Sequence, residues 1–108
     1  MTLAERSKLM RKMFDEEIMP LNERKGMDYS GAEDSMANMR DFGFLGIVIR
    51  LGDKFHRLKN FAKVGSLQVK SESVEDTLID MINYAFFALM FHREERREKQ
   101  IPDWQADN

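Results

Sequence analysis

The chain has 108 residues, of which 43% are apolar and 33% are charged, and it contains no cysteine. This length fits one domain, and a chain this short leaves much apolar surface in water unless it associates. The absence of cysteine excludes a disulfide framework and thiolate metal sites such as zinc fingers. The formal net charge of -2 excludes the strongly basic class of duplex-DNA binders, so we expect no direct nucleic-acid binding.

The N-terminus is charged from its first turn and lacks the apolar core of a signal peptide. The longest apolar stretch, from Tyr84 to Phe91, is far shorter than the ~20 residues that a membrane-spanning helix needs. We therefore expect no membrane partner and a cytoplasmic location.

Apolar residues at spacings of three and four predict an N-terminal helix over residues 1–20. Thr2 and Glu5 form the capping-box pattern at its start, and Pro20 is expected to end it. The polar stretch over residues 21–31 is typical of a loop. After it, Ser30 and Glu33 have the spacing of a second capping box and indicate a short helix.

Two further segments, 42–61 and 73–100, have helical periodicity and are predicted to be the core helices that carry the site. Glycines interrupt the first, and such glycines usually mark the close approach of a backbone or a ligand. The second begins at a Ser73–Asp76 cap, and its middle is apolar on nearly every side, as in a helix buried between others. Residues 63–71 are expected to form a loop and residues 101–108 a tail, so residues 1–108 are predicted to be a single helical domain.

A polar stripe runs along the last predicted helix, where Asp76, Asp80 and Asn83 follow one another at spacings of four and three. Apolar residues surround this stripe, and burying an unpaired carboxylate costs on the order of several kcal/mol. Cations are therefore expected opposite it. The helix over residues 42–61 offers them on one face, which consists of Arg50, Asp53, Lys54 and Arg57.

If these two stripes face each other, Asp53, Asp76 and Asp80 converge from two helices. Oxygen ligands of this kind suit Mg²⁺ or Mn²⁺, and we expect such an ion as cofactor, with Glu72 as a further metal ligand. If such an ion activates a water for attack on a phosphate group, we expect Asp53 and Asp80 to be catalytic. The candidate general base is then Glu75, or else Glu72.

The cations and loop residues are expected to bind the substrate, a nucleotide. The residues predicted to neutralise its phosphate groups are Arg50, Lys54 and Arg57. Asn83 would orient a ligand or the water, and Asp28 with Tyr29 would close over the base together with aromatic residues from Phe42 to Phe44.

A structural interpretation stays open for each of these residues. The facing stripes can be interhelical salt bridges in a bundle or a dimer. Glu72 and Glu75 suit the positive end of a helix dipole without any ligand. Tyr29 can equally be a buried residue that anchors its loop.

Two blocks of the sequence resemble a known family. Residues 46–60 read GIVIRLGDKFHRLKN and residues 72–85 read ESVEDTLIDMINYA. Together with Asp28 and Tyr29, they resemble the phage and bacterial nucleotide modification associated domain, a compact relative of the MazG-like all-α nucleoside triphosphate pyrophosphohydrolases. The resemblance covers roughly residues 25–89.

This resemblance implies a MazG-like four-helix bundle that assembles as a homodimer or homotetramer. It also implies Mg²⁺-dependent hydrolysis of a (deoxy)nucleoside triphosphate to the monophosphate and pyrophosphate, in phage or bacterial nucleotide-pool metabolism. The MazG pattern has ExxE on one helix and ExxD on the next. Asp53 and Asp80 fall at the last position of each motif, whereas Arg50 and Thr77 stand where the first acids are expected.

The alternative function is a non-catalytic helical subunit that binds a nucleotide or another protein. In that case, the facing charged stripes are structural salt bridges.

Overall fold

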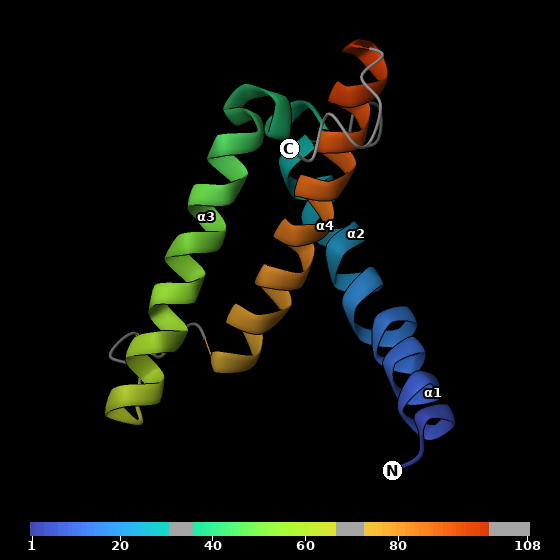
Figure 1. Ribbon diagram of the computed structural model, residues 1–108, viewed down its shortest axis with the longest axis vertical. Helices are drawn as coiled ribbons and strands as arrows, with labels where there is room; N and C mark the ends of the chain where they lie inside the picture. Colours follow the sequence, from blue (N-terminus) through green and yellow to red (C-terminus); the bar gives the residue numbers. More distant parts are fainter. Residues whose placement is uncertain (31–35, 67–72, 100–108) are drawn as a thin grey trace. The chain divides into compact units, whose positions relative to one another are not determined.

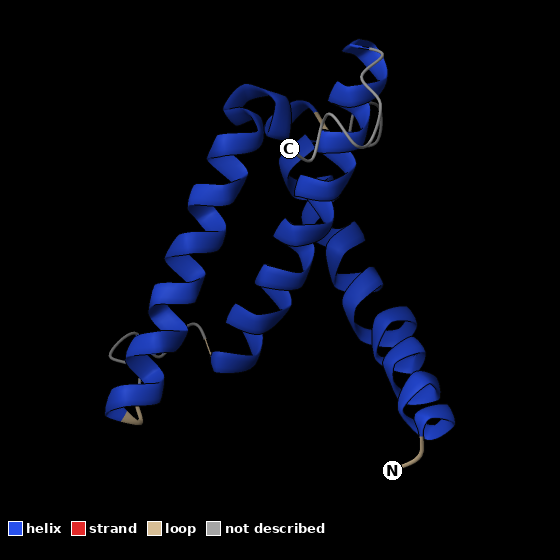
Figure 2. Ribbon diagram, in the orientation of Figure 1, coloured by secondary structure: helices blue, strands red, loops and turns tan. Residues whose placement is uncertain are grey.

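The computed structural model describes residues 1–30, 36–66 and 73–99 of the chain, and every element in them is helical (Figure 2). This confirms the predicted all-α class. The chain divides into two compact units, Met1–Asn38 and Met39–Asn108, and each is described by itself. The single domain expected over residues 1–108 stays a prediction. Within the described ranges, no helix has an apolar stretch of the length needed to cross a membrane.

The first unit is a succession of helical segments, namely α1 (Leu3–Met13), the π-helical turn η1 (Phe14–Ile18) and α2 (Met19–Ser30) (Figure 1). Its start confirms the predicted capping box. The backbone N–H of Thr2 donates to Glu5 Oε2 at 3.0 Å, and the N–H of Glu5 donates to Thr2 Oγ1 at 3.1 Å. Two of the N–H groups that a helix start leaves without intrahelical partners are thereby satisfied.

Pro20 does not end this helix, contrary to the sequence-based expectation, and residues 21–30 are helical rather than a loop. A proline inside an α-helix lacks the N–H for the usual bond, and its ring collides with the carbonyl four residues earlier. Here the π turn comes immediately before the proline, with the N–H of Met19 bonded to the carbonyl of Phe14, five residues back. The wider turn accommodates the proline, because π-bulges re-route the carbonyls of the preceding turn.

The second unit contains α3 (Ala37–Val64) from Met39 onward and α4 (Val74–Lys99). Both predicted core helices are therefore found, and α3 extends beyond residues 42–61 at either end. Gly43 interrupts α3 with φ 71° and ψ -178°, a conformation open essentially to glycine alone. At the end of α3, Gly65 has φ 84° and its N–H donates to the carbonyl of Phe61 at 2.7 Å, as expected of a glycine C-cap.

Ser73 and Asp76 cap the start of α4, as the sequence predicted. The N–H of Asp76 donates to Ser73 Oγ at 3.0 Å, while the N–H and the hydroxyl of Ser73 both donate to Asp76 Oδ2. The short helix expected after Ser30, most of the loop over residues 63–71 and the tail over residues 101–108 lie outside the described residues.

Three polar contacts join α3 to α4 and define an antiparallel register, which Figure 1 shows as two oppositely directed neighbouring helices. Their residue pairs are Arg40 with Glu94, Lys54 with Asp80, and Arg57 with Thr77. Each step forward along α3 in this series is matched by an equal step backward along α4. The charged end of α4 takes part in this packing, because Glu94 pairs with Arg40 at 2.9 Å.

Among the described residues of this unit, the buried side chains include Ile47 of α3 and Thr77, Asn83 and Ala88 of α4. The middle of α4 was predicted to be buried on nearly every side, and this is wrong for one face. Leu78, Ile82, Phe86, Leu89 and Met90 are each more than two-fifths exposed there.

Candidate functional site

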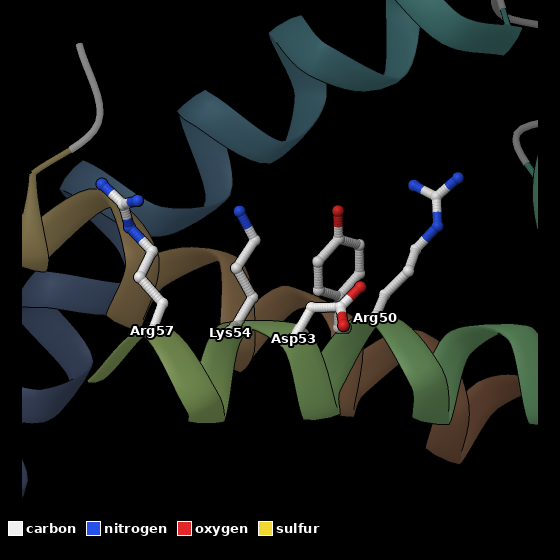
Figure 3. A pocket seen from close by; sticks show the side chains of 5 residues that line it. Arg50, Asp53, Lys54 and Arg57 are labelled. Atoms are coloured by element: carbon white, nitrogen blue, oxygen red, sulfur yellow. The ribbon is translucent and has the colours of Figure 1, made fainter. Parts of the chain in front are cut away.

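A hollow of about 490 Å³ lies over one face of α3, and Tyr84 of α4 contributes to its lining. The α3 residues that line it are Arg50, Asp53, Lys54 and Arg57. Figure 3 shows their four side chains rising from the same side of the helix. This follows from their spacing, because residues three, four and seven positions apart share one face of an α-helix. The basic stripe that the sequence predicted therefore exists as a concave surface.

Arg57 is held at one end of this hollow by Thr77. Its Nε donates to Thr77 Oγ1 at 3.2 Å, and the Thr77 hydroxyl in turn donates to the backbone carbonyl of Ser73 at 3.0 Å. Thr77 is fully buried, so its hydroxyl is a fixed acceptor. This bond fixes the orientation of a guanidinium, the group whose planar fork of donors matches a phosphate or carboxylate at two points.

Lys54 lies in the middle of the hollow, with its Nζ 3.2 Å from Asp80 Oδ2. Both side chains are about four-fifths buried, at 20% and 18% exposure. At this depth the pair is screened less by water than a surface pair, and losing one partner costs more. The interhelical salt bridge that the sequence left open as an alternative therefore exists for this pair.

Arg50 stands at the other end, with its guanidinium carbon 4.7 Å from the centre of the Phe42 ring. A cation over an aromatic face is attracted by the ring, by about 0.5–1 kcal/mol at exposed sites. The backbone between them determines this contact. Gly43 turns the chain, and a Cβ on Gly46 would lie only 2.5 Å from the Cβ of Phe42. Glycine at position 46 thus leaves room for the ring that packs on Arg50.

The charges at the hollow favour an anion. Among the described residues, three cationic side chains line it against one carboxylate, that of Asp53, which is exposed. The Asp80 carboxylate engages Lys54 from α4. Arg50 and Arg57 lie about two turns apart on α3, one at each end of the hollow (Figure 3), so a bound anion would have an arginine on either side.

The acids predicted to bind a metal are not gathered in one place. No group of three or more His, Cys, Asp and Glu side chains that could hold a metal ion is found in the part of the chain that the structure describes. Asp76 is exposed and its carboxylate caps the start of α4, and Asp80 pairs with Lys54. Glu75 is exposed nine residues before Tyr84, about two and a half helical turns, so it lies on the opposite face of α4 from the hollow. Glu72 lies outside the described residues.

The remaining predicted site residues are not among the residues that line the hollow. Asn83 is buried in α4 and is not one of the lining residues named above. Asp28 is exposed near the end of α2, and Tyr29 follows it in the same helix of the first unit. Their roles in orienting water and in enclosing the base stay predictions.

Two residues of this site were not singled out from the sequence as functional. Tyr84 follows Asp80 by four residues and Thr77 by seven, so the polar stripe on α4 extends to it by ordinary helical spacing. Thr77 was seen only as a departure from an acidic motif. Its position seven residues from Tyr84 on the same face was the signal that it contacts α3.

In a comparison with known protein families, the model of the nucleotide modification associated domain 1 matches residues 27–91. This region includes the α3 and α4 residues that line the hollow and the start of the α4 cap. A comparison with curated proteins and a comparison with solved structures each found no match.

Proposed function

Because this chain belongs to the nucleotide modification associated domain 1 family, we propose that it binds the phosphate groups of a nucleoside triphosphate in the hollow over α3. We further propose that it hydrolyses this substrate to the monophosphate and pyrophosphate, as a MazG-like enzyme of phage or bacterial nucleotide pools would. The observation that carries the proposal is that Arg50, Lys54 and Arg57 line one concave surface, where Asp53 is the one carboxylate among the described lining residues.

The cations have separate parts in binding. Arg57, oriented by Thr77, binds one phosphate group at one end of the hollow, and Arg50 binds a second group from the other end. Charge-assisted hydrogen bonds of this kind are worth about 1.5–3 kcal/mol each. Tyr84 adds a phenol beside them, and the half-exposed ring of Phe42 offers an aromatic surface for the base near Arg50.

A divalent ion fits this site only in company with the substrate. Mg²⁺ usually takes one or two protein carboxylates and fills its other positions with water and substrate phosphates. Asp53 is the carboxylate that lines the hollow, and Asp80 becomes a second ligand where a phosphate draws Lys54 away from it. Bound there, the ion would neutralise charge on the triphosphate.

The reaction adds one water across the anhydride linkage in which one bridging oxygen joins the α-phosphorus to the β-phosphorus. The water oxygen forms a bond to one phosphorus, the bond from that phosphorus to the bridging oxygen breaks, and the bridging oxygen leaves with the electron pair. Asp53, the carboxylate that lines the hollow, would accept the proton of the attacking water. Arg50 and Arg57 stabilise the negative charge that develops on the separating phosphate groups, which is their main contribution to the rate.

A second function has its own supporting observation. Asp80 is paired with Lys54, Asp76 is engaged in a helix cap, and the described residues gather no three metal-binding side chains. These features favour a subunit that binds a nucleotide in the same hollow without hydrolysing it. The two functions share the binding step and differ in product formation.

The test measures nucleotide binding and product formation on the same protein. Each common ribo- and deoxyribonucleoside triphosphate is incubated with Mg²⁺, with Mn²⁺ and with a chelator, and monophosphate and pyrophosphate are quantified. Hydrolysis predicts equal amounts of the two products with a divalent ion. Asp53→Asn should then abolish turnover, while Lys59→Gln, an exposed charge off the lining, should leave it unchanged. Binding without either product supports the non-catalytic function, and absence of binding rejects both.

A further inference from the structure

One face of α4 carries a continuous row of exposed apolar side chains. Its members, Leu78, Ile82, Phe86, Leu89 and Met90, are all between 43% and 47% exposed. We call these five residues the α4 outer stripe. Successive residues of a helix turn by about 100°, so the five fall within an arc of about 120°. A row of this kind is unusual for the water-facing side of a small protein, where exposed apolar residues are normally scattered.

The α4 outer stripe lies on the opposite side of the helix from the site. Tyr84, which lines the hollow, and Thr77, which holds Arg57, are about half a turn away from the centre of the stripe. The buried residue Ala88 also belongs to that inner side. Covering the stripe therefore leaves the hollow open.

The two ends of the stripe carry opposite charges. Glu75 precedes Leu78 on the same face, and Arg93 follows Met90 on it, and both are exposed. From Glu75 to Arg93 the face extends about 27 Å along the helix axis, since each residue rises about 1.5 Å. The stripe is thus an apolar strip that is acidic at one end and basic at the other.

We propose that the α4 outer stripe pairs with the same stripe of a second copy of this chain, with the two helices antiparallel. A two-fold axis midway between Ile82 and Phe86 places each of these opposite the other in the partner. The same register brings Leu78 opposite Met90 and Glu75 opposite Arg93. Each of these six positions then meets a complementary one, which is what an isologous interface requires. The inference does not depend on the proposed function.

The charges at the two ends of the stripe favour a second copy of this chain as the partner and an antiparallel direction of the two helices. A parallel pairing would set Glu75 against Glu75 and Arg93 against Arg93 of the second copy, and like charges in contact are unfavourable. The antiparallel pairing forms two Glu75–Arg93 ion pairs, one at each end of the apolar strip. A face that complements itself in this way has a second copy of the same chain as its natural occupant.

Charge reversal tests this arrangement. The mass of the full-length protein in solution is measured by light scattering after size-exclusion chromatography, across a range of concentrations. We expect the wild type to be a dimer. Glu75→Arg and Arg93→Glu should each weaken the dimer at least tenfold in Kd, and the double variant should restore it, because the reversed pair forms again. Glu98→Arg, an exposed reversal on the same helix away from the stripe, should leave Kd within about twofold.

Ile82→Glu, a change in the centre of the stripe, should give a monomer. Circular dichroism shows whether each variant keeps the helical content of the wild type, and any variant that loses it is replaced by Ile82→Ser at the same position. A monomeric wild type overturns the proposal. A dimer that survives both Glu75→Arg and the change at Ile82, or single reversals that the double variant fails to rescue, overturns it as well.

Discussion

Arg57 donates a hydrogen bond of 3.2 Å from Nε to the hydroxyl of Thr77, a residue with no exposed surface. The bond joins the last turn of the α3 stripe to the first turn of α4 and fixes the direction in which the guanidinium fork points. An acidic residue at position 77 would instead form a salt bridge with this arginine. Threonine fixes the arginine without neutralising its charge.

Thr77→Val is expected to lower the free energy of unfolding by about 1–2 kcal/mol, because it removes a buried hydroxyl that both donates and accepts. Phosphate binding should weaken as well, since Arg57 loses the acceptor that orients it. Thr77→Ser keeps the hydroxyl and is the matched control for binding. Urea denaturation and titration with a nucleoside triphosphate measure the two effects. Equal affinity of the valine and serine variants would contradict the positioning role.

The Lys54–Asp80 pair is expected to be energetically coupled, because it connects the two helices at about four-fifths burial. A cycle of Lys54→Met, Asp80→Asn and the double variant should give a coupling energy of about 1–3 kcal/mol, between the values for exposed and buried pairs. Chemical denaturation at neutral pH provides the measurement. Strict additivity of the single effects would mean that the pair contributes nothing as a pair.

Two helical glycines of α3 make a matched comparison. Gly46→Ala places a methyl group 2.5 Å from the Cβ of Phe42 and should displace the ring from Arg50, lowering stability by about 1–3 kcal/mol. Gly52→Ala meets no atom within 4 Å and should raise stability by about 0.5–1 kcal/mol, because alanine is the better helix former. The midpoints of thermal unfolding of the two variants, compared with the wild type, measure both effects on stability. A stabilising Gly46→Ala would show that Phe42 does not pack as described.

The helices of the second unit could be predicted because their apolar spacing and their caps agree. The Ser73–Asp76 cap and the face formed by Arg50, Asp53, Lys54 and Arg57 follow from local rules of helix geometry. The π turn before Pro20 could not be predicted, since proline alone indicates a helix end. A proline is tolerated only when the preceding turn widens, and no residue type specifies that.

The partners of the acidic residues at the candidate site could not be predicted from the sequence either. Spacing placed Asp76 and Asp80 on one stripe, but it does not tell which partner each carboxylate takes. Asp76 lies one turn inside a helix start, where the cap offers it closer donors than any distant cation. Asp80 lies opposite Lys54 in the antiparallel register, and that register depends on the packing of two helices rather than on either sequence alone.

Arg50 and Arg57 are proposed to hold the phosphate groups of a nucleoside triphosphate. Calorimetric titration of variants with the nucleotide tests this most directly. Arg50→Gln and Arg57→Gln should each raise Kd about tenfold to a hundredfold, the equivalent of one charge-assisted hydrogen bond. Lys59→Gln removes the same charge from an exposed α3 position off the hollow and should change Kd by less than about twofold. If all three variants bind as tightly as the wild type, or all three weaken alike, the hollow is not the phosphate site.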